Sequence, residues 1–213
     1  MRHMNENALR EQICDIARSL YDRGLTHGST GNISARCGEH WLLTPTGSSL
    51  GRLDPARLSK LDHEGRLMSG DAPSKESFLH LGMYQQRAGS QAVLHLHATH
   101  SVAVSVLADI DAEDVLPPIT AYYVMRIGRL PLVPYHAPGD MKLADAVRSV
   151  AAKHHAMLLA NHGPVVAGAS LAAAADAVEE LEATARLYLL LQGRQMRALT
   201  PQQCAELRER YPT

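Results

Sequence analysis

The sequence predicts a single α/β domain in which helices cover a mixed β-sheet. Strand-like and helix-like apolar patterns alternate irregularly along the 213 residues, and short turns between strand-like segments indicate hairpins. Neither an internal repeat nor a long low-complexity linker divides the chain, and its length is ordinary for one α/β domain. We therefore expect residues 1–213 to form one domain.

The N-terminal third is expected to supply one helix and two pairs of strands. An apolar face at helical spacing predicts the helix, which Gly24 ends; its members are Leu9, Ile13, Ala17 and Leu20. Short strands are expected at 33–36 and 41–44, and a hairpin at 61–68 that turns at Glu64-Gly65. Small polar residues make 26–32 and 44–49 loops.

The rest of the chain is expected to alternate between helices and strands. Pro73 precedes a helix that Ser74 caps, and Asp140 caps a later helix. Further helices are expected at about 101–107 and 171–191, with a short amphipathic piece after residue 200. The segments expected as strands are 92–98, 122–125, 132–135, 156–160 and 165–166.

Charge and composition exclude several classes of protein. Lys and Arg number 21 against 22 Asp and Glu, so the chain lacks the basic excess of a nucleic-acid or membrane-surface protein. Its three cysteines are far apart, which argues against a disulfide scaffold. The start is polar, and no apolar run approaches the about 20 residues that span a bilayer. We expect a soluble cytoplasmic protein that binds neither nucleic acid nor membranes.

Histidine is the unusual component, because 12 histidines outnumber the seven Tyr, one Trp and one Phe together. Two of them stand in Leu94-His95-Leu96-His97, within a segment expected to be a strand. Side chains alternate along a strand, so His95 and His97 would project from one face, and paired imidazoles are a common start of a metal site. From these residues alone, a metal site and a solvated polar face are equally good interpretations.

A third histidine and a carboxylate strengthen the metal interpretation. His162 follows the strand expected at 156–160 and lies at a turn, where functional groups are common. Three histidine ligands leave a coordination position open, as catalytic metal sites require. Glu76 lies in the first turn of its helix, where the helix dipole alone favours a carboxylate. A turn histidine with a local hydrogen bond and a helix-terminus carboxylate are the structural alternatives.

Two loops have the composition of anion-binding turns. Residues 28–32 and 46–49 combine small hydroxyl side chains with backbone N–H groups, a combination that binds phosphate. Neither loop has the GxxxxGK[ST] pattern of a nucleotide-binding P-loop, and a loop of this composition is more often just a turn. Lys75, next to Glu76, suits either an anionic ligand or a plain surface position.

Taken in order, five segments resemble the class II aldolase/adducin family, which includes fuculose-phosphate aldolase and ribulose-phosphate 4-epimerase. The segments are 28–34, 44–47, 73–76, 95–97 and 161–163, and they extend over nearly the whole chain. Each is weak alone, but five in this order are specific. The resemblance implies a single three-layer α/β/α domain around a mainly antiparallel mixed sheet, and a homotetramer with active sites between subunits.

The resemblance also implies roles for individual residues. His95, His97 and His162 resemble zinc ligands, although imidazoles also suit manganese, cobalt and iron. Glu76 resembles an acid/base carboxylate that also reaches the metal, and Tyr123 a proton donor contributed by a neighbouring subunit. The substrate- and phosphate-binding positions would be Ser29, Gly31, Asn32, Thr46, Gly47, Ser74 and Lys75, with Arg126 and Arg129 as further cationic candidates.

Within the family, the chain is similar to a branch that decarboxylates 3-oxo-tetronate 4-phosphate. Lys75 stands where sugar-phosphate aldolases tend to have serine, and 121–128 differs from their glycine-rich sequence. The implied activity is that of a carbon–carbon lyase in sugar-acid catabolism. Loss of CO2 from the four-carbon β-keto acid leaves a metal-stabilised enediolate, and protonation at carbon 2 gives dihydroxyacetone phosphate.

Two other functions stand as alternatives. The same enediolate would serve an aldolase acting on fuculose or rhamnulose phosphate, or a 4-epimerase. A non-catalytic interaction module is the alternative from a different class, because adducin belongs to the family. Adducin lacks the metal histidines, whereas this chain has all three, which favours an enzyme.

Overall fold

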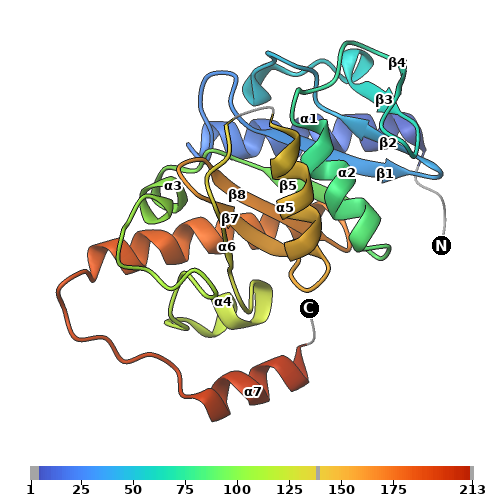
Figure 1. Ribbon diagram of the computed structural model, residues 1–213. Helices are drawn as coiled ribbons and strands as arrows, with labels where there is room; N and C mark the ends of the chain where they lie inside the picture. The colour runs from blue at the N-terminus through green and yellow to red at the C-terminus, as the bar shows by residue number, and fades with distance from the viewer. Residues whose placement is uncertain (1–4, 138–139, 212–213) are drawn as a thin grey trace.

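The computed structural model describes residues 5–137 and 140–211, in which one eight-stranded sheet lies between two layers of helices (Figure 1). The strand order is β4-β3-β2-β1-β5-β8-β7-β6, and every neighbouring pair is antiparallel except β6 with β7. The strands are β1 Asn32–Cys37, β2 His40–Leu43, β3 Ser59–Leu61, β4 Leu67–Ser69, β5 Ala92–His95, β6 Leu132–Val133, β7 Ala156–Leu159 and β8 Gly163–Gly168. The expected α/β/α fold with a mainly antiparallel sheet is confirmed.

Helices and two 3-10 turns connect the strands. The helices are α1 Glu6–Asp22, α2 Ser77–Gln86, α3 Thr99–Ser105, α4 Ala121–Arg126, α5 Met141–Ala151, α6 Leu171–Leu190 and α7 Pro201–Arg210, and the turns are η1 Leu50–Arg52 and η2 Pro55–Arg57. Helix α7 lies apart from the sheet, against α4 (Figure 1). Among the helices that the structure describes, none has both the length and the apolar character needed to cross a membrane.

Two apolar cores lie on opposite faces of the sheet, because side chains alternate along each strand. Val93 of β5 packs with residues of α2 and α5, whereas Leu94 packs on the other face with α1 and α6. Val165 and Val166 of β8 divide in the same way. This alternation directs the side chain of His95, the next residue of β5, toward the face that α2 covers.

Residues 122–125, predicted to be a strand, instead form most of helix α4, so this prediction was wrong. Thr120 Oγ accepts a hydrogen bond from the backbone N–H of Tyr123 at 3.0 Å and caps the first turn. Tyr123 and Ile127, one helical turn apart, are both buried in the core. The cap and this packing outweigh the strand preference of the aromatic and β-branched side chains.

Two predicted boundaries shift close to the histidines. The strand expected at 92–98 ends at His95, so His97 lies in the segment that leads to α3. Helix α2 begins at Ser77 with Glu76 at its N-cap position, and Ser74, the expected cap, accepts a hydrogen bond from the Glu76 N–H at 3.3 Å. Both shifts place candidate ligands at the ends of elements rather than inside them.

Two glycines allow the backbone to close around the segment 95–97. A Cβ on Gly163 would lie 2.3 Å from the carbonyl oxygen of Leu96, and a Cβ on Gly31 would lie 3.0 Å from the carbonyl oxygen of His95. Both glycines also have positive φ angles, 152° and 78°, which disfavour a side chain. The start of β8 and the start of β1 therefore approach the end of β5 only because these positions lack a side chain.

Replacing Gly163 by alanine is expected to lower the free energy of unfolding by more than about 2 kcal/mol, because it adds backbone strain to a clash with Leu96. Urea denaturation measures this difference. Gly89→Ala is the matched control, because a Cβ at Gly89 meets nothing within 4 Å. Equal midpoints for the two variants would show that β8 can move away from β5 at little cost.

Candidate metal centre

Glu76, His95, His97 and His162 converge at one end of the sheet. Each offers one ligand atom, and these four atoms all lie within 4.8 Å of one another. Glu76 Oε1 is 3.1 Å from His162 Nε2, and Glu76 Oε2 is 3.5 Å from His95 Nε2. The centroids of the three imidazole rings are 4.8–5.0 Å apart. The structure thus brings together the four ligands expected from the sequence.

Three segments of the chain position these side chains. Glu76 precedes α2, His95 ends β5, and His97 follows two residues later. His162 lies in the turn between β7 and β8, where Asn161 has a left-handed φ of 57° that asparagine tolerates well. The histidines therefore come from turns and strand ends that the sheet holds in register.

The backbone decides which nitrogen of His95 faces the cluster. His95 Nδ1 lies 2.9 Å from the carbonyl oxygen of Pro164, and because a carbonyl only accepts, Nδ1 carries the hydrogen. His95 Nε2 therefore presents its lone pair toward His162 Nε2, 3.3 Å away. His162 Nε2 lies between this lone pair and Glu76 Oε1, 3.1 Å away, so a cation at this point would take the place of the hydrogen on His162 Nε2.

Burial and hydrogen bonding set the charges of the cluster. Burial lowers the pKa of His97 to about 4, and it also lowers the pKa of His95. Burial alone would raise the pKa of Glu76, but hydrogen bonds with His162 and Asn32 outweigh it and hold that pKa well below its usual range. Neutral imidazoles beside an ionised carboxylate are a donor set that a divalent metal ion accepts.

A row of buried hydrogen bonds extends from Glu76 between α2 and β1. Glu76, His80 and Tyr84 succeed one another at helical spacing, and Asn32 and Ser34 face them from β1. The four links join Glu76 Oε2 to Asn32 Nδ2 (2.8 Å), Asn32 Oδ1 to His80 Nε2 (2.5 Å), His80 Nδ1 to Ser34 Oγ (2.7 Å), and Ser34 Oγ to the Tyr84 hydroxyl (2.8 Å). We call these five residues the polar row.

Every hydrogen in the polar row is donated toward Glu76. A carboxylate only accepts, so the Asn32 NH₂ group faces Glu76 and its Oδ1 faces His80. His80 therefore carries its hydrogen on Nε2. Burial lowers the pKa of His80 to about 3, so the ring is neutral and its Nδ1 accepts the hydrogen of Ser34 Oγ, which in turn accepts from Tyr84. The row fixes the orientation of the Asn32 amide and, through it, the Glu76 carboxylate.

Ser34, His80 and Tyr84 were not predicted as site residues from the sequence. Their only signal is spacing, because His80 and Tyr84 follow Glu76 by four and eight residues, and Ser34 follows Asn32 by two. Pro164 was also missed as the partner of His95, since a backbone carbonyl has no signature in a sequence.

The expected phosphate-binding loops gather beside Glu76. Thr46 N–H donates to the Ala72 carbonyl at 2.9 Å, which ties the loop containing Thr46 and Gly47 to the segment before Ser74. Asn32 Nδ2 also donates to Ser74 Oγ at 3.2 Å, so both hydrogens of this amide are already used. The exposed positions of these loops, open to a ligand, are Ser29, Thr46, Gly47 and Lys75, while Gly31 packs against β5.

Tyr123 and Arg126 lie away from the cluster of their own chain. Tyr123 is 1% exposed in the core shared with α1 and α6, and within the described residues its buried hydroxyl has no hydrogen-bond partner. Burial raises its pKa. Its neighbour Tyr122 is 59% exposed. Arg126 pairs with Asp176 at 2.7 Å, and Arg129 reaches Asp114 at 4.0 Å.

Comparison with known proteins decides the family. Residues 11–189 match the family described as Class II Aldolase and Adducin N-terminal domain. The chain belongs to the class II aldolase/adducin family. This confirms the family resemblance from which the roles of the site residues were expected.

Relatives within the family carry two kinds of name. The 3-oxo-tetronate 4-phosphate decarboxylase of Escherichia coli (strain K12) is 50% identical over 204 residues, which cover 95% of this chain and 96% of the relative. The crystal structure of YgbL from Escherichia coli has a TM-score of 0.93 at 48% identity and covers 95% of this chain and 99% of that one. The L-fuculose phosphate aldolase of Methanocaldococcus jannaschii is 36% identical over 182 residues, 85% of this chain and 96% of the relative.

Replacing His97 by alanine is expected to weaken the binding of divalent metal by more than about 100-fold, because a direct ligand contributes more than the outer contacts that tune it. Elemental analysis after dialysis measures the metal content per chain. His63→Ala is the matched control, since His63 is exposed in the hairpin between β3 and β4. Wild-type protein without bound metal, indistinguishable from His97→Ala, would favour a non-catalytic module.

Replacing His80 by phenylalanine is expected to lower the free energy of unfolding by about 2 kcal/mol or more, because it leaves Asn32 Oδ1 without its donor and the Ser34 hydroxyl hydrogen without its acceptor. Tyr84→Phe, at the end of the polar row, removes one donor and is expected to cost about half as much. Urea denaturation of both variants tests the order. An equal or reversed order would mean that His80 is not linked to Asn32 in solution.

Proposed function

We propose that this protein is a divalent-metal-dependent lyase that converts 3-oxo-tetronate 4-phosphate to dihydroxyacetone phosphate and CO2. The convergence of three imidazoles and one carboxylate on a single point carries the proposal. The relative at 50% identity that is named for this activity aligns with nearly the whole chain. Lys75 supports the proposal further, because an exposed cation beside Glu76 suits a substrate with two anionic groups.

The reaction breaks the bond between carbons 1 and 2. CO2 departs without the electron pair, which moves toward the carbonyl oxygen on carbon 3 and produces an enediolate. A divalent cation held by His95, His97 and His162, which we propose to be zinc, with manganese, cobalt or iron as alternatives, would supply the positive charge that stabilises this species. A proton added at carbon 2 then completes dihydroxyacetone phosphate.

Glu76 is the group of this chain best placed to move that proton. Its carboxylate is ionised in the free protein, so it must first take up a proton, from water or from a substrate hydroxyl, before it can deliver one. Asn32 holds Oε2 through the polar row, and Oε1 remains on the side of His162. This arrangement restricts the carboxylate to one orientation while the proton moves.

The loops around Glu76 are proposed to bind the two anionic ends of the substrate. Ser29, Thr46, Gly47 and Ser74, together with the backbone of Gly31, would hold the phosphate, since these turns carry hydroxyl and N–H donors. Lys75 would neutralise the carboxylate before it leaves as CO2. The side chain of Asn32 has no hydrogen left for the phosphate, and the pairing of Asn32 with His95 between β1 and β5 uses its backbone N–H, so Asn32 would serve the substrate by positioning Ser74 and Glu76.

A cytoplasmic homotetramer with sites between subunits is proposed from the family resemblance. In that arrangement Tyr123 would donate a proton in the site of a neighbouring subunit, and this role stays a prediction. Because Tyr123 is buried in its own chain and Tyr122 is exposed, a neighbouring subunit would meet Tyr122 first. Tyr122 is therefore the second position at which a shared tyrosine should be sought.

An aldolase acting on a sugar phosphate is the second candidate. The L-fuculose phosphate aldolase relative at 36% identity supports it, and retro-aldol cleavage passes through the same kind of enediolate. The two functions differ in the group that departs, since a decarboxylase releases CO2 and an aldolase releases an aldehyde. Product analysis therefore distinguishes them directly.

Metal-loaded protein given 3-oxo-tetronate 4-phosphate is expected to release CO2 and form dihydroxyacetone phosphate in equal amounts. A coupled assay for the triose phosphate and trapping of CO2 measure both products. Glu76→Gln is expected to keep its fold but lose about 10²–10⁴-fold in turnover, the usual contribution of a general acid/base.

Cleavage of fuculose or rhamnulose phosphate without CO2 release from the keto acid would replace the decarboxylase proposal with the aldolase. Unchanged turnover of Glu76→Gln would leave Glu76 as no more than a helix-terminus carboxylate. Ser77→Ala, which changes the neighbouring residue at the start of α2, is the matched control for this variant.

A further inference from the structure

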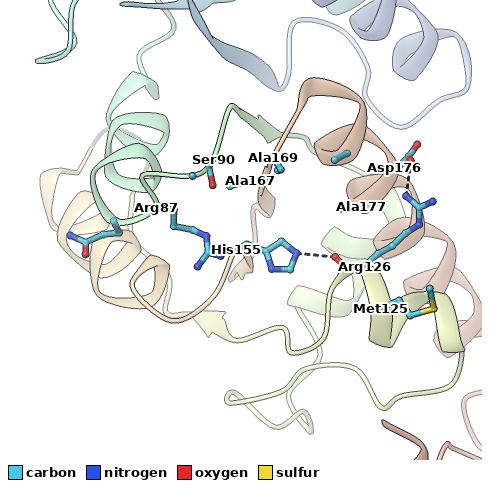
Figure 2. A pocket seen from close by; sticks show the side chains of 13 residues that line it. Arg87, Ser90, Met125, Arg126, His155, Ala167, Ala169, Asp176 and Ala177 are labelled. Carbon is cyan, nitrogen blue, oxygen red and sulfur yellow. Dashed lines mark hydrogen bonds and ion pairs between the residues drawn. The ribbon is translucent and has the colours of Figure 1, made fainter. Parts of the chain in front are cut away.

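A cavity lies at the end of the sheet strands opposite to the histidine cluster (Figure 2). Its volume is about 620 Å³, which is within the range of small-molecule sites. Ser90 lies just before β5, His155 just before β7, and Gly168 at the end of β8, whereas the opposite ends of these strands lead to the histidine cluster. At about 3.3 Å per residue, the length of β8 separates the two sites by roughly 16 Å.

Arg87 brings a guanidinium to this cavity with no acidic partner in the described part of the chain. It follows the end of α2, and its Nη1 makes only a long contact of 3.4 Å with the carbonyl oxygen of Ala151. Its Nε is buried and has no hydrogen-bond partner among residues 5–137 and 140–211. A buried hydrogen-bond donor without an acceptor lowers the stability of the fold, so a ligand with a negatively charged or carbonyl oxygen would satisfy Arg87.

On the opposite wall of the cavity the positive and negative side-chain charges cancel. Arg126 pairs with Asp176 at 2.7 Å, and His155 Nε2 donates to the carbonyl oxygen of Arg126 at 2.8 Å, as the dashed lines of Figure 2 show. Burial lowers the pKa of His155, so this imidazole is neutral at neutral pH. The residues that line the cavity therefore have a net positive charge, and Arg87 carries it.

Small side chains provide the space between these walls. The apolar lining residues are Met125, Ala167, Ala169, Ala173 and Ala177. A Cβ on Gly168 would lie 2.5 Å from the backbone nitrogen of Ala174, so α6 packs directly on the end of β8. The cavity is thus lined by packed secondary structure, with a cationic side and an apolar side.

We propose that this cavity binds a small organic anion, with its carboxylate or phosphate on Arg87 and an apolar body against Met125 and the alanines. The Nε and Nη hydrogens of a guanidinium point in parallel at two oxygens of such a group, so a turn of the Arg87 side chain toward the cavity would give the buried Nε the acceptor it lacks. A single excess charge fits a singly charged head group. This site is distinct from the metal centre and does not depend on the proposed reaction.

Benzoate and phenyl phosphate are suitable probes, because they place a carboxylate or a phosphate on the same apolar ring. Each is titrated into the metal-loaded full-length protein, and binding is followed by saturation-transfer NMR and by the ¹⁵N–¹H signal of Arg87 Nε. We expect saturable binding of at least one probe with a shift of that signal. Benzyl alcohol, which has the ring without the charge, is expected to bind at least about tenfold more weakly.

Arg87→Gln is expected to weaken binding of the preferred probe by about tenfold or more. Arg87→Lys keeps the positive charge but not the paired N–H donors of the guanidinium, so it is expected to weaken binding by a smaller factor. Arg186→Gln is the matched control, since Arg186 is exposed on α6. Unchanged affinity in Arg87→Gln would falsify the proposal, as would failure of both probes to bind. Loss of probe binding in His97→Ala would instead assign the anion to the metal centre. If a second copy of the chain covers Arg87, so that neither probe shifts the Arg87 Nε signal, the cavity belongs to a subunit interface.

Discussion

The carbonyl oxygen of Leu96 and the α-carbon of Gly163 approach so closely that no side chain fits between them. This contact lets the carbonyl oxygen of Pro164 accept from both Leu96 N–H and His95 Nδ1. One backbone oxygen therefore holds the end of β5 against β8 and also sets the tautomer of His95. His162 directly precedes Gly163, so its position relative to His95 depends on the same approach.

The polar row shows how a carboxylate is held without a charged partner. Asn32 is paired with His95 in the register of β1 and β5, and its amide reaches Glu76 at the start of α2. The chain of hydrogen bonds behind Asn32 is buried between a strand and a helix, where its members have few other partners. Such preorganisation spares the site from reorienting its dipoles during a reaction.

Much of the metal centre was predictable because its ligands carry local signals. His95 and His97 are spaced by two, His162 stands at a turn, and Glu76 begins a helix, so order along the chain was enough to suggest them. Helix α4 was mistaken for a strand because a short aromatic and β-branched run has the same appearance in either element. Its actual form is decided by Thr120 and by packing against α6 and α7, which lie far away in the sequence.

Other features were beyond prediction for a different reason. Ser34 and Tyr84 are ordinary residues whose importance lies in the partners that the fold gives them across separate elements. The cavity beside Arg87 is bounded by alanines, and an empty volume is the absence of side chains rather than a pattern among them. Reactive side chains are therefore easier to predict from a sequence than cavities or buried hydrogen-bond networks.

The one-way direction of the polar row has an evolutionary consequence. Each internal member donates on one side and accepts on the other, so a replacement that offers two donors or two acceptors interrupts the alternation for its neighbours. Positions 32, 34, 80 and 84 are therefore constrained as a set and not singly. Among related sequences they should covary, with compensating exchanges appearing in pairs across the boundary between strand β1 and helix α2.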